Sequence, residues 1–424
     1  MRIAVVGSGI SGLVAALRLA ERHDVLLFEA APSLGGHTHT VEVDDDGRPC
    51  SVDMGFIVYN RATYPRFIEL LDELGVATQL SDMGLSVRTA DGSVEYASSA
   101  RQLFAQRRNL ARPKFWRMLS GIVRFNRIAR SVLDTTGDEP TMGELLERHR
   151  LDGPVVDWFI IPMLAAVWST DPSRVLEYPA RTLATFLSNH GLLQIRNQPP
   201  WRVVSGGSQT YVRAIAKRLG DRRIHLNSPI ENVRRLPGSG VELTTRRGDT
   251  VNVDEVIIAT HSDQALAMID RPTDSERAIL GAIPYQDNEV VLHTDERLMP
   301  QRKRAWASWN CLVEGSDRER SRPVRLTYWM NNLQSLDTTR QYFVSLNSGD
   351  AIDPESVIER RVFAHPLFNS TSVAAQRRWE DISGVDRLHF CGAYWGWGFH
   401  EDGVRSGLRV VAALDRRVAA LEVA

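Results

Sequence analysis

The first thirty residues constrain the fold more strongly than any other part of the chain. A short β-branched run at 2–6 leads into the turn Gly7-Ser8-Gly9-Ile10-Ser11-Gly12, apolar residues at helical spacing follow, and a second apolar run ends at Glu29. Glycines at this spacing allow a tight turn, a close approach of the backbone to a pyrophosphate, and close packing of a helix on a strand. The helix N-terminus would face the phosphates and Glu29 a ribose hydroxyl. The stretch therefore predicts a Rossmann-type dinucleotide-binding unit, and the alternative is an ordinary βαβ unit with a glycine-rich turn.

Composition narrows the class of protein. The chain has 424 residues, a net charge of −1 and 24 % charged residues, which favours a globular protein of two or three domains and argues against a nucleic-acid binder. Its three cysteines, Cys50, Cys311 and Cys391, are too widely spaced for a disulfide framework or a zinc site. The first expected strand starts at residue 2, so we expect no signal peptide before it. The most apolar stretch, 155–168, is too short to span a bilayer. We therefore expect a cytoplasmic protein without a metal site.

Local patterns place further elements along the chain. Helices are expected at 65–74, which begins with Pro65, and at 209–219, which Ser208 should cap. A second strand, glycine-rich loop and helix unit occurs at the far end of the chain, with its helix expected from 404 to about 421. Strands and a hairpin are expected at 38–43, 51–53, 80–98 (turning at Asp91-Gly92), 224–226, 230–235, 241–245, 250–253 and 256–260.

Residues 101–130 differ from the rest of this nearly neutral chain. The segment holds nine Lys or Arg residues, no acidic residue, and four interleaved Phe and Trp residues. It predicts a basic amphipathic helical region. One interpretation is a solvated helix face. The other is a docking surface on anionic phospholipid, peripheral on the inner face of a membrane.

Taken together and in this order, the motifs resemble the superfamily of flavin-dependent amine oxidases, protoporphyrinogen oxidases and phytoene desaturases. The resemblance covers nearly the whole chain. It implies a Rossmann-type FAD domain formed by residues 1–78, 197–265 and 384–424. An α+β substrate domain with a helical cap, residues 79–196 and 266–383, would be interleaved with it. The closing loop lacks the cysteine that tethers flavin in some relatives, so the resemblance implies non-covalent FAD.

The resemblance also assigns residues to the cofactor. His37 stands where members of the superfamily usually have Arg. The motif positions that imply contacts with FAD are Gly7, Gly9, Ser11, Gly12, Glu29, Ala30, Gly35, Gly36, His37, Gly55, Phe56, Ile230, Gly392, Asp402, Gly403 and Val404.

Candidate catalytic and substrate residues follow from the same resemblance. Amine oxidases of this fold place a Lys beside flavin N5, and the corresponding position here falls at Asn288 or Glu289, which argues against amine oxidation. Asn288 is the candidate for that position. His400 and Glu401 are candidates for a proton relay, or they cap a helix. Three tryptophans are candidate walls of a substrate tunnel or core packing: Trp168, Trp395 and Trp397.

More narrowly, 293–295, 306–310 and 394–403 resemble an uncharacterised branch often labelled "NAD/FAD-binding protein", whose genes often neighbour cyclopropane-fatty-acid synthases. This resemblance favours an FAD-dependent oxidoreductase that takes a hydride from a C–H bond of an apolar, fatty-acyl substrate. Two alternatives stay open: an amine or polyisoprenoid oxidase of the same fold, and a non-catalytic flavoprotein partner of a lipid-modifying enzyme.

Overall fold

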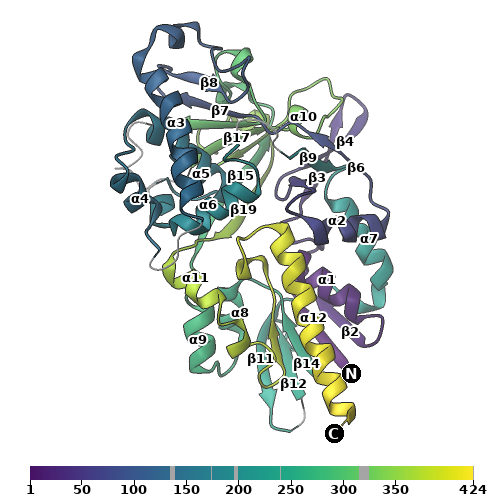
Figure 1. Cartoon of the computed structure of the whole chain (residues 1–424). Helices are drawn as coiled ribbons and strands as arrows, with labels where there is room; N and C mark the ends of the chain where they lie inside the picture. The colour runs from purple at the N-terminus through teal and green to yellow at the C-terminus, as the bar shows by residue number, and fades with distance from the viewer. Residues whose placement is uncertain (134–138, 173, 195–198, 239, 315–323, 424) are drawn as a thin grey trace.

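A computed structural model describes residues 1–133, 139–172, 174–194, 199–238, 240–314 and 324–423. Two sheets dominate the structure (Figure 1). A five-stranded parallel sheet brings together strands from both ends of the chain, and a seven-stranded mixed sheet is built from its middle. None of the helices in the described part of the chain is both long and apolar enough to cross a bilayer.

The parallel sheet lies between two cores. Its order is β10 (Ile224–His225), β2 (Asp24–Phe28), β1 (Arg2–Val6), β14 (Glu255–Ile258) and β20 (Leu388–Phe390). Ile3 and Val5 face a core shared with α1 (Ile10–Leu19) and α12 (His400–Val423), whereas Ala4 and Val6 face a second core. Burial on both faces explains why these strands are continuous apolar runs.

The mixed sheet carries helices on one side (Figure 1). Its order is β19 (Val357–Pro366), β15 (Tyr285–His293), β18 (Phe343–Leu346), β17 (Arg325–Trp329), β16 (Trp309–Val313), β7 (Leu85–Thr89) and β8 (Glu95–Ala97). The helices beside it are α3 (Pro113–Ser131), α4 (Met142–Arg148), α5 (Ile161–Trp168) and α6 (Ala180–Asn189).

Smaller elements connect the two sheets. The remaining strands are β3 (Thr40–Asp45), β4 (Arg48–Asp53), β5 (Val58–Asn60), β6 (Thr78–Ser81), β9 (Trp201–Val204), β11 (Ile230–Leu236), β12 (Gly240–Thr245) and β13 (Thr250–Val253). The remaining α-helices of the described residues are α2 (Pro65–Leu74), α7 (Gln209–Leu219), α8 (Ser262–Met268), α9 (Asp274–Leu280), α10 (Met330–Leu333) and α11 (Ser370–Gln376).

The predicted fold class is confirmed, and the bounds of α2 and α7 are as expected. The predicted cap of α7 is wrong. Ser208 uses its hydroxyl to bind Asp53 (2.8 Å), and the first N–H of the helix, from Gln209, is accepted by Thr40 Oγ1 (2.9 Å). Asp53 is distant from Ser208 in sequence. Because its carboxyl group is buried, it needs hydrogen-bond donors around it, and the Ser208 hydroxyl is one of them.

Two further expectations are corrected. Helix α12 begins at His400 rather than 404, because Asp402 accepts the backbone N–H groups of Trp397 and Phe399 and so closes the preceding loop earlier. The basic segment is only partly α-helical. It forms a 3₁₀ turn at Arg107–Ala111 before α3 starts at Pro113, a residue that fits the first turn of a helix.

Candidate functional site

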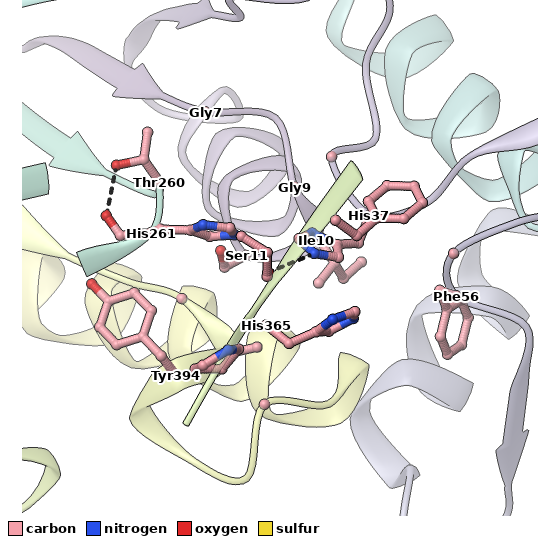
Figure 2. Close-up of a pocket in the computed structure, with 18 of the residues that line it drawn as sticks. Gly7, Gly9, Ile10, Ser11, His37, Phe56, Thr260, His261, His365 and Tyr394 are labelled. Atoms are coloured by element: carbon pink, nitrogen blue, oxygen red, sulfur yellow. Dashed lines mark hydrogen bonds between the residues drawn. The ribbon is translucent and has the colours of Figure 1, made fainter. Parts of the chain in front are cut away.

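One cavity of about 820 Å³ runs from the N-terminus of α1 to the helices beside the mixed sheet. Its walls come from the glycine turn, the 35–37 and 54–58 segments, the end of β19 and the loop before α12. Figure 2 shows His37, His261 and His365 gathered beside the turn that carries Gly7 and Gly9. Residues that are far apart in sequence therefore share one binding space.

The glycine turn has the shape that a pyrophosphate requires. Gly7 has φ +102°, a conformation that other residues rarely adopt. A Cβ on Gly12 would lie 2.0 Å from the carbonyl oxygen of Gly7, so this glycine allows the turn to pack on α1. A Cβ on Gly9 would meet no protein atom within 4 Å. Gly9 therefore faces open space beside the N-terminus of α1, where free N–H groups attract phosphate.

Glu29 lies at the same end of the cavity and organises the backbone around it. Its carboxylate accepts hydrogen bonds from the N–H groups of Ser8 (2.9 Å) and Ala31 (2.8 Å). The neighbouring wall contains Ser228, Ile230 and Arg246. This end combines an acid for a ribose with a wall for a base, as an adenosine group needs.

The second glycine pair contacts the first turn. Gly36 has φ +58°, and a Cβ there would lie 3.0 Å from the Cα of Gly9. A Cβ on Gly55 would lie 1.9 Å from the carbonyl oxygen of His37, so only glycine lets these two segments approach. Gly35, Gly36, His37 and Gly55 all line the cavity, as do Ser11, Ala30 and Gly392.

His400 lines the cavity at the start of α12. Its ring stacks on Phe56 with the ring centres 3.4 Å apart, and its Nε2 lies 2.9 Å from Tyr211 Oη and 3.1 Å from Thr38 Oγ1. Burial lowers the pKa of His400 well below the ordinary value. His400 is therefore a neutral ring held by two hydroxyls.

The other predicted residues of α12 lie behind this wall. Glu401 accepts the N–H groups of Arg66 (3.2 Å) and Phe67 (3.0 Å) and so caps α2. Asp402 anchors the loop that carries Trp397, and burial raises its pKa to about 6. Gly403 packs on the start of α1, where a Cβ would lie 2.5 Å from the side chain of Ile10, and Val404 is buried in the core shared by α1 and α12. Gly12 instead packs against Gly7 and Ala259. These residues would act on a cofactor through backbone and packing.

The predicted substrate tryptophans divide into two groups. Trp168 and Trp397 line the far end of the cavity, where Trp168 packs against Phe186 (4.6 Å between ring centres) and Phe399 (6.1 Å). Trp395 packs between the two cores beside Tyr394. Asn288 is fully buried, and its side chain contacts His365, which itself lines the cavity.

Sequence reasoning missed two histidines. His261 and His365 line the cavity, and the ring centre of His37 is 5.4 Å from the ring centre of each. Burial lowers the pKa of His37 and of His261 to about 4 and that of His365 to about 3. These residues come from three distant segments and share no local motif, so only the tertiary structure reveals the cluster.

Charge is unevenly distributed along the cavity. The charged groups among its described lining residues are Glu29, Glu231 and Arg246, which all lie at the adenosine end. The opposite end is lined by neutral histidines and by aliphatic and aromatic side chains, among them Val167, Trp168, Tyr328, Leu346, Phe363 and Phe368. This end suits an uncharged, apolar ligand.

The geometry defines the class of protein. A glycine turn, an acid at the adenosine end, and a helix N-terminus supplied by each end of the chain form the cradle of a dinucleotide-binding flavoprotein. Residues 10–415 match the model of the family of flavin-containing amine oxidoreductases. The chain belongs to this family and is an FAD-dependent oxidoreductase.

Solved structures share this fold at low sequence identity. Cyclohexylamine oxidase from Brevibacterium oxydans has a TM-score of 0.70 and 18 % identity, with 99 % of each chain covered. A putative protoporphyrinogen oxidase from Exiguobacterium has a TM-score of 0.71 and 14 % identity, over 98 % of this chain and 99 % of that one. A CLA-producing fatty acid isomerase from P. acnes has a TM-score of 0.68 and 16 % identity, over 97 % of this chain and 98 % of that one.

Proposed function

We propose that this oxidoreductase removes a hydride from a C–H bond of an apolar substrate of the fatty-acyl class. The observation that carries the proposal is the absence of a charged side chain among the described residues that line the end of the cavity opposite Glu29, which contains Trp168 and Phe368 and is called the reaction end below. When bound, FAD supplies the hydride-accepting ring. The chain's own aromatic and aliphatic residues would exclude water and align the substrate carbon.

Desolvation of the ligand separates the two substrate classes. An ammonium group transferred from water into an apolar cavity loses several kcal/mol of hydration unless a carboxylate or a hydrogen-bond network compensates it. An alkyl chain gains about 0.8 kcal/mol for each CH₂ that leaves water. Trp168, Leu346 and Phe368 offer such apolar surface. The lining therefore favours an alkyl chain over a cationic amine.

The structural neighbours support two candidates. One neighbour is described as a fatty acid isomerase, in agreement with a lipid substrate. Another is described as a cyclohexylamine oxidase, which keeps amine oxidation as the second candidate. The test is anaerobic mixing of the FAD-loaded protein with lipid extract, free fatty acid, or cyclohexylamine, followed by flavin absorbance. We expect bleaching by a lipid fraction, whereas bleaching by the amine alone would overturn the proposal.

We also propose that the surface formed by residues 107–127 docks on an anionic membrane. Three large apolar side chains are exposed there, Leu110 (54 %), Trp116 (50 %) and Val123 (49 %). Trp116, Val123 and Arg127 are spaced by seven and four residues, so they share one face of α3. On a phospholipid surface, the basic residues of such a face would contact anionic headgroups, and the exposed Trp would enter the boundary between headgroups and acyl chains.

Several of the basic residues have structural roles, which limits the docking charge. Arg108 binds backbone carbonyls of the β7–β8 hairpin, Arg117 pairs with Asp152, and Arg124 binds the carbonyl of His149. Exposed Arg107, Lys114 and Arg127 have no side-chain partner among the described residues and are the best candidates for lipid contacts. Each such cation adds about 1 kcal/mol near an anionic surface before screening by salt.

The docking test uses vesicles of phosphatidylcholine with and without phosphatidylglycerol. The triple variant R107Q/K114Q/R127Q should lose binding to the anionic vesicles. The matched control R48Q/R61Q/R222Q changes three exposed arginines elsewhere and should bind as the unmodified protein does. Equal binding by both triple variants would contradict the docking surface.

A further inference from the structure

A hydrogen-bond network lies directly behind the cavity and centres on Asn288. Its Nδ2 lies 2.9 Å from Nδ1 of His365. Its Oδ1 accepts hydrogen bonds from the side-chain amides of Asn347 (2.8 Å) and Gln286 (3.2 Å). The direction of each bond determines where His365 carries its proton.

Backbone groups fix the orientation of Asn347. The N–H of Glu289 donates to Asn347 Oδ1 (3.1 Å), and Asn347 Nδ2 donates to the carbonyl of Val324 (3.1 Å). A backbone N–H can only donate and a carbonyl can only accept. Asn347 must therefore turn its NH₂ group toward Asn288.

Gln286 is fixed in the same way from the other side. The N–H of Asp171 donates to Gln286 Oε1 (3.2 Å), and Gln286 Nε2 donates to the carbonyl of Ser169 (3.3 Å). Two independently anchored amides thus donate to the same oxygen of Asn288. The NH₂ group of Asn288 is left facing His365, whose Nδ1 must accept.

We infer that His365 is a fixed, neutral hydrogen-bond donor, which presents its Nε2–H to an acceptor atom of the molecule bound in the cavity. Asn288 is the positioning residue that sets this tautomer. The inference rests on the proposed function in one respect only, that the acceptor belongs to FAD or to the substrate. It assigns His365 the role of orienting an acceptor, not of moving a proton.

The surroundings of His365 agree with this role. The ring lines the cavity, and no hydrogen-bond partner of Nε2 is found in the described parts of the chain. The titratable rings that face it are those of His37 and His261, and burial together with His37 lowers its pKa to about 3. A second proton at Nδ1 would place an N–H donor of His365 against the NH₂ donor of Asn288, so the ring stays neutral.

The first test is nitrogen NMR of the FAD-loaded protein with ¹⁵N-labelled histidine, with the His365 signal assigned from H365F. We expect a bare Nδ1, a protonated Nε2, and no titration of His365 between pH 5 and 8. A protonated Nδ1, or titration near the ordinary histidine pKa, would overturn the inference. This readout needs no substrate, so it is independent of the proposed reaction.

The variant N288D reverses the hydrogen bond at almost constant shape. A carboxylate only accepts, so His365 should move its proton to Nδ1 and its pKa should rise by at least one unit. The control N252D makes the same charge change at an exposed side chain on β13 and should leave His365 unchanged. An unchanged tautomer in folded N288D would also overturn the inference.

The variant H365F distinguishes the two possible acceptors. If FAD carries the acceptor, the dissociation constant of FAD should rise about two- to tenfold, which is the worth of one hydrogen bond. If the substrate carries it, the dissociation constant of FAD stays the same and decanol, used as a neutral alkyl-chain probe, should bind about two- to tenfold more weakly. A folded H365F that alters neither value would contradict the donor role.

Discussion

The two ends of the cavity are built in different ways. The adenosine end is formed mainly by backbone: Gly7, Gly9 and Gly36 bring main-chain segments together at the cavity wall, and Glu29 organises two of its N–H groups. The reaction end is formed by side chains from segments far apart in sequence, and its described titratable rings are neutral. We therefore expect backbone to recognise the part of FAD that such enzymes share, and side chains to define which substrate this enzyme oxidises.

The first prediction is that replacing glycine by alanine at two positions of the same turn has different effects on stability and on FAD binding. In G12A the new methyl group would lie 2.0 Å from a carbonyl oxygen, so the turn and α1 must separate. Overpacking of this kind costs about 1–3 kcal/mol or more. In G9A the methyl group meets no protein atom within 4 Å. We expect G12A to lower the free energy of unfolding of the FAD-free protein, and G9A to leave it unchanged while abolishing tight FAD binding.

Urea unfolding and a flavin-fluorescence titration measure these two effects separately. The comparison would fail if G9A destabilised the FAD-free protein as much as G12A does. It would also fail if G9A bound FAD as tightly as the unmodified protein.

The second prediction concerns Glu29. In E29Q only one side-chain oxygen is left to accept from Ser8 and Ala31, and the charge that strengthens these bonds is lost. A ribose hydroxyl that donates to a charged acceptor forms a bond worth about 1.5 kcal/mol more than one to a neutral acceptor, so FAD affinity should fall about tenfold. A calorimetric titration with FAD checks this, and an unchanged dissociation constant would remove Glu29 from the cofactor site.

The third prediction tests the loop at the reaction end. Burial raises the pKa of Asp402 from 3.8 to about 6 in the folded protein. The folded state therefore holds a proton that the unfolded state has released between about pH 4 and 6, and stability falls as the pH rises through this window. Each pKa unit corresponds to about 1.4 kcal/mol, so this carboxyl contributes a loss of about 3 kcal/mol by pH 7.

The variant D402N should remove this part of the pH dependence. Asp402 accepts both loop N–H groups, from Trp397 and Phe399, through one oxygen, so the amide oxygen can replace it. Asp53 has a similarly raised pKa of about 6 and would retain its own contribution in the variant. Urea unfolding from pH 4.5 to 7 should therefore show a smaller slope in D402N, and an unchanged slope would contradict the account.

The same contrast explains how much could be predicted from the sequence. The Rossmann unit, α2, α7 and most of the glycines that line the cavity could be predicted because local spacing encodes them. The tautomer of His365 and the actual hydrogen bonds of Ser208 could not, because each depends on residues more than a hundred positions away in sequence or on several strands at once. Local motifs therefore predict the adenosine end of the cavity, which is formed by backbone. The reaction end is determined by tertiary contacts between side chains.

The most direct test of the central claim compares three ligands with the same ten-carbon chain: decanol, decanoate and decylammonium. Each is titrated into the FAD-loaded protein at pH 7, and the shift of the flavin absorbance gives its dissociation constant. A reaction end with neutral walls predicts that decanol binds at least tenfold more tightly than either ion, because an unpaired buried charge loses its hydration. Tighter binding of decylammonium would contradict the account and favour an amine oxidase.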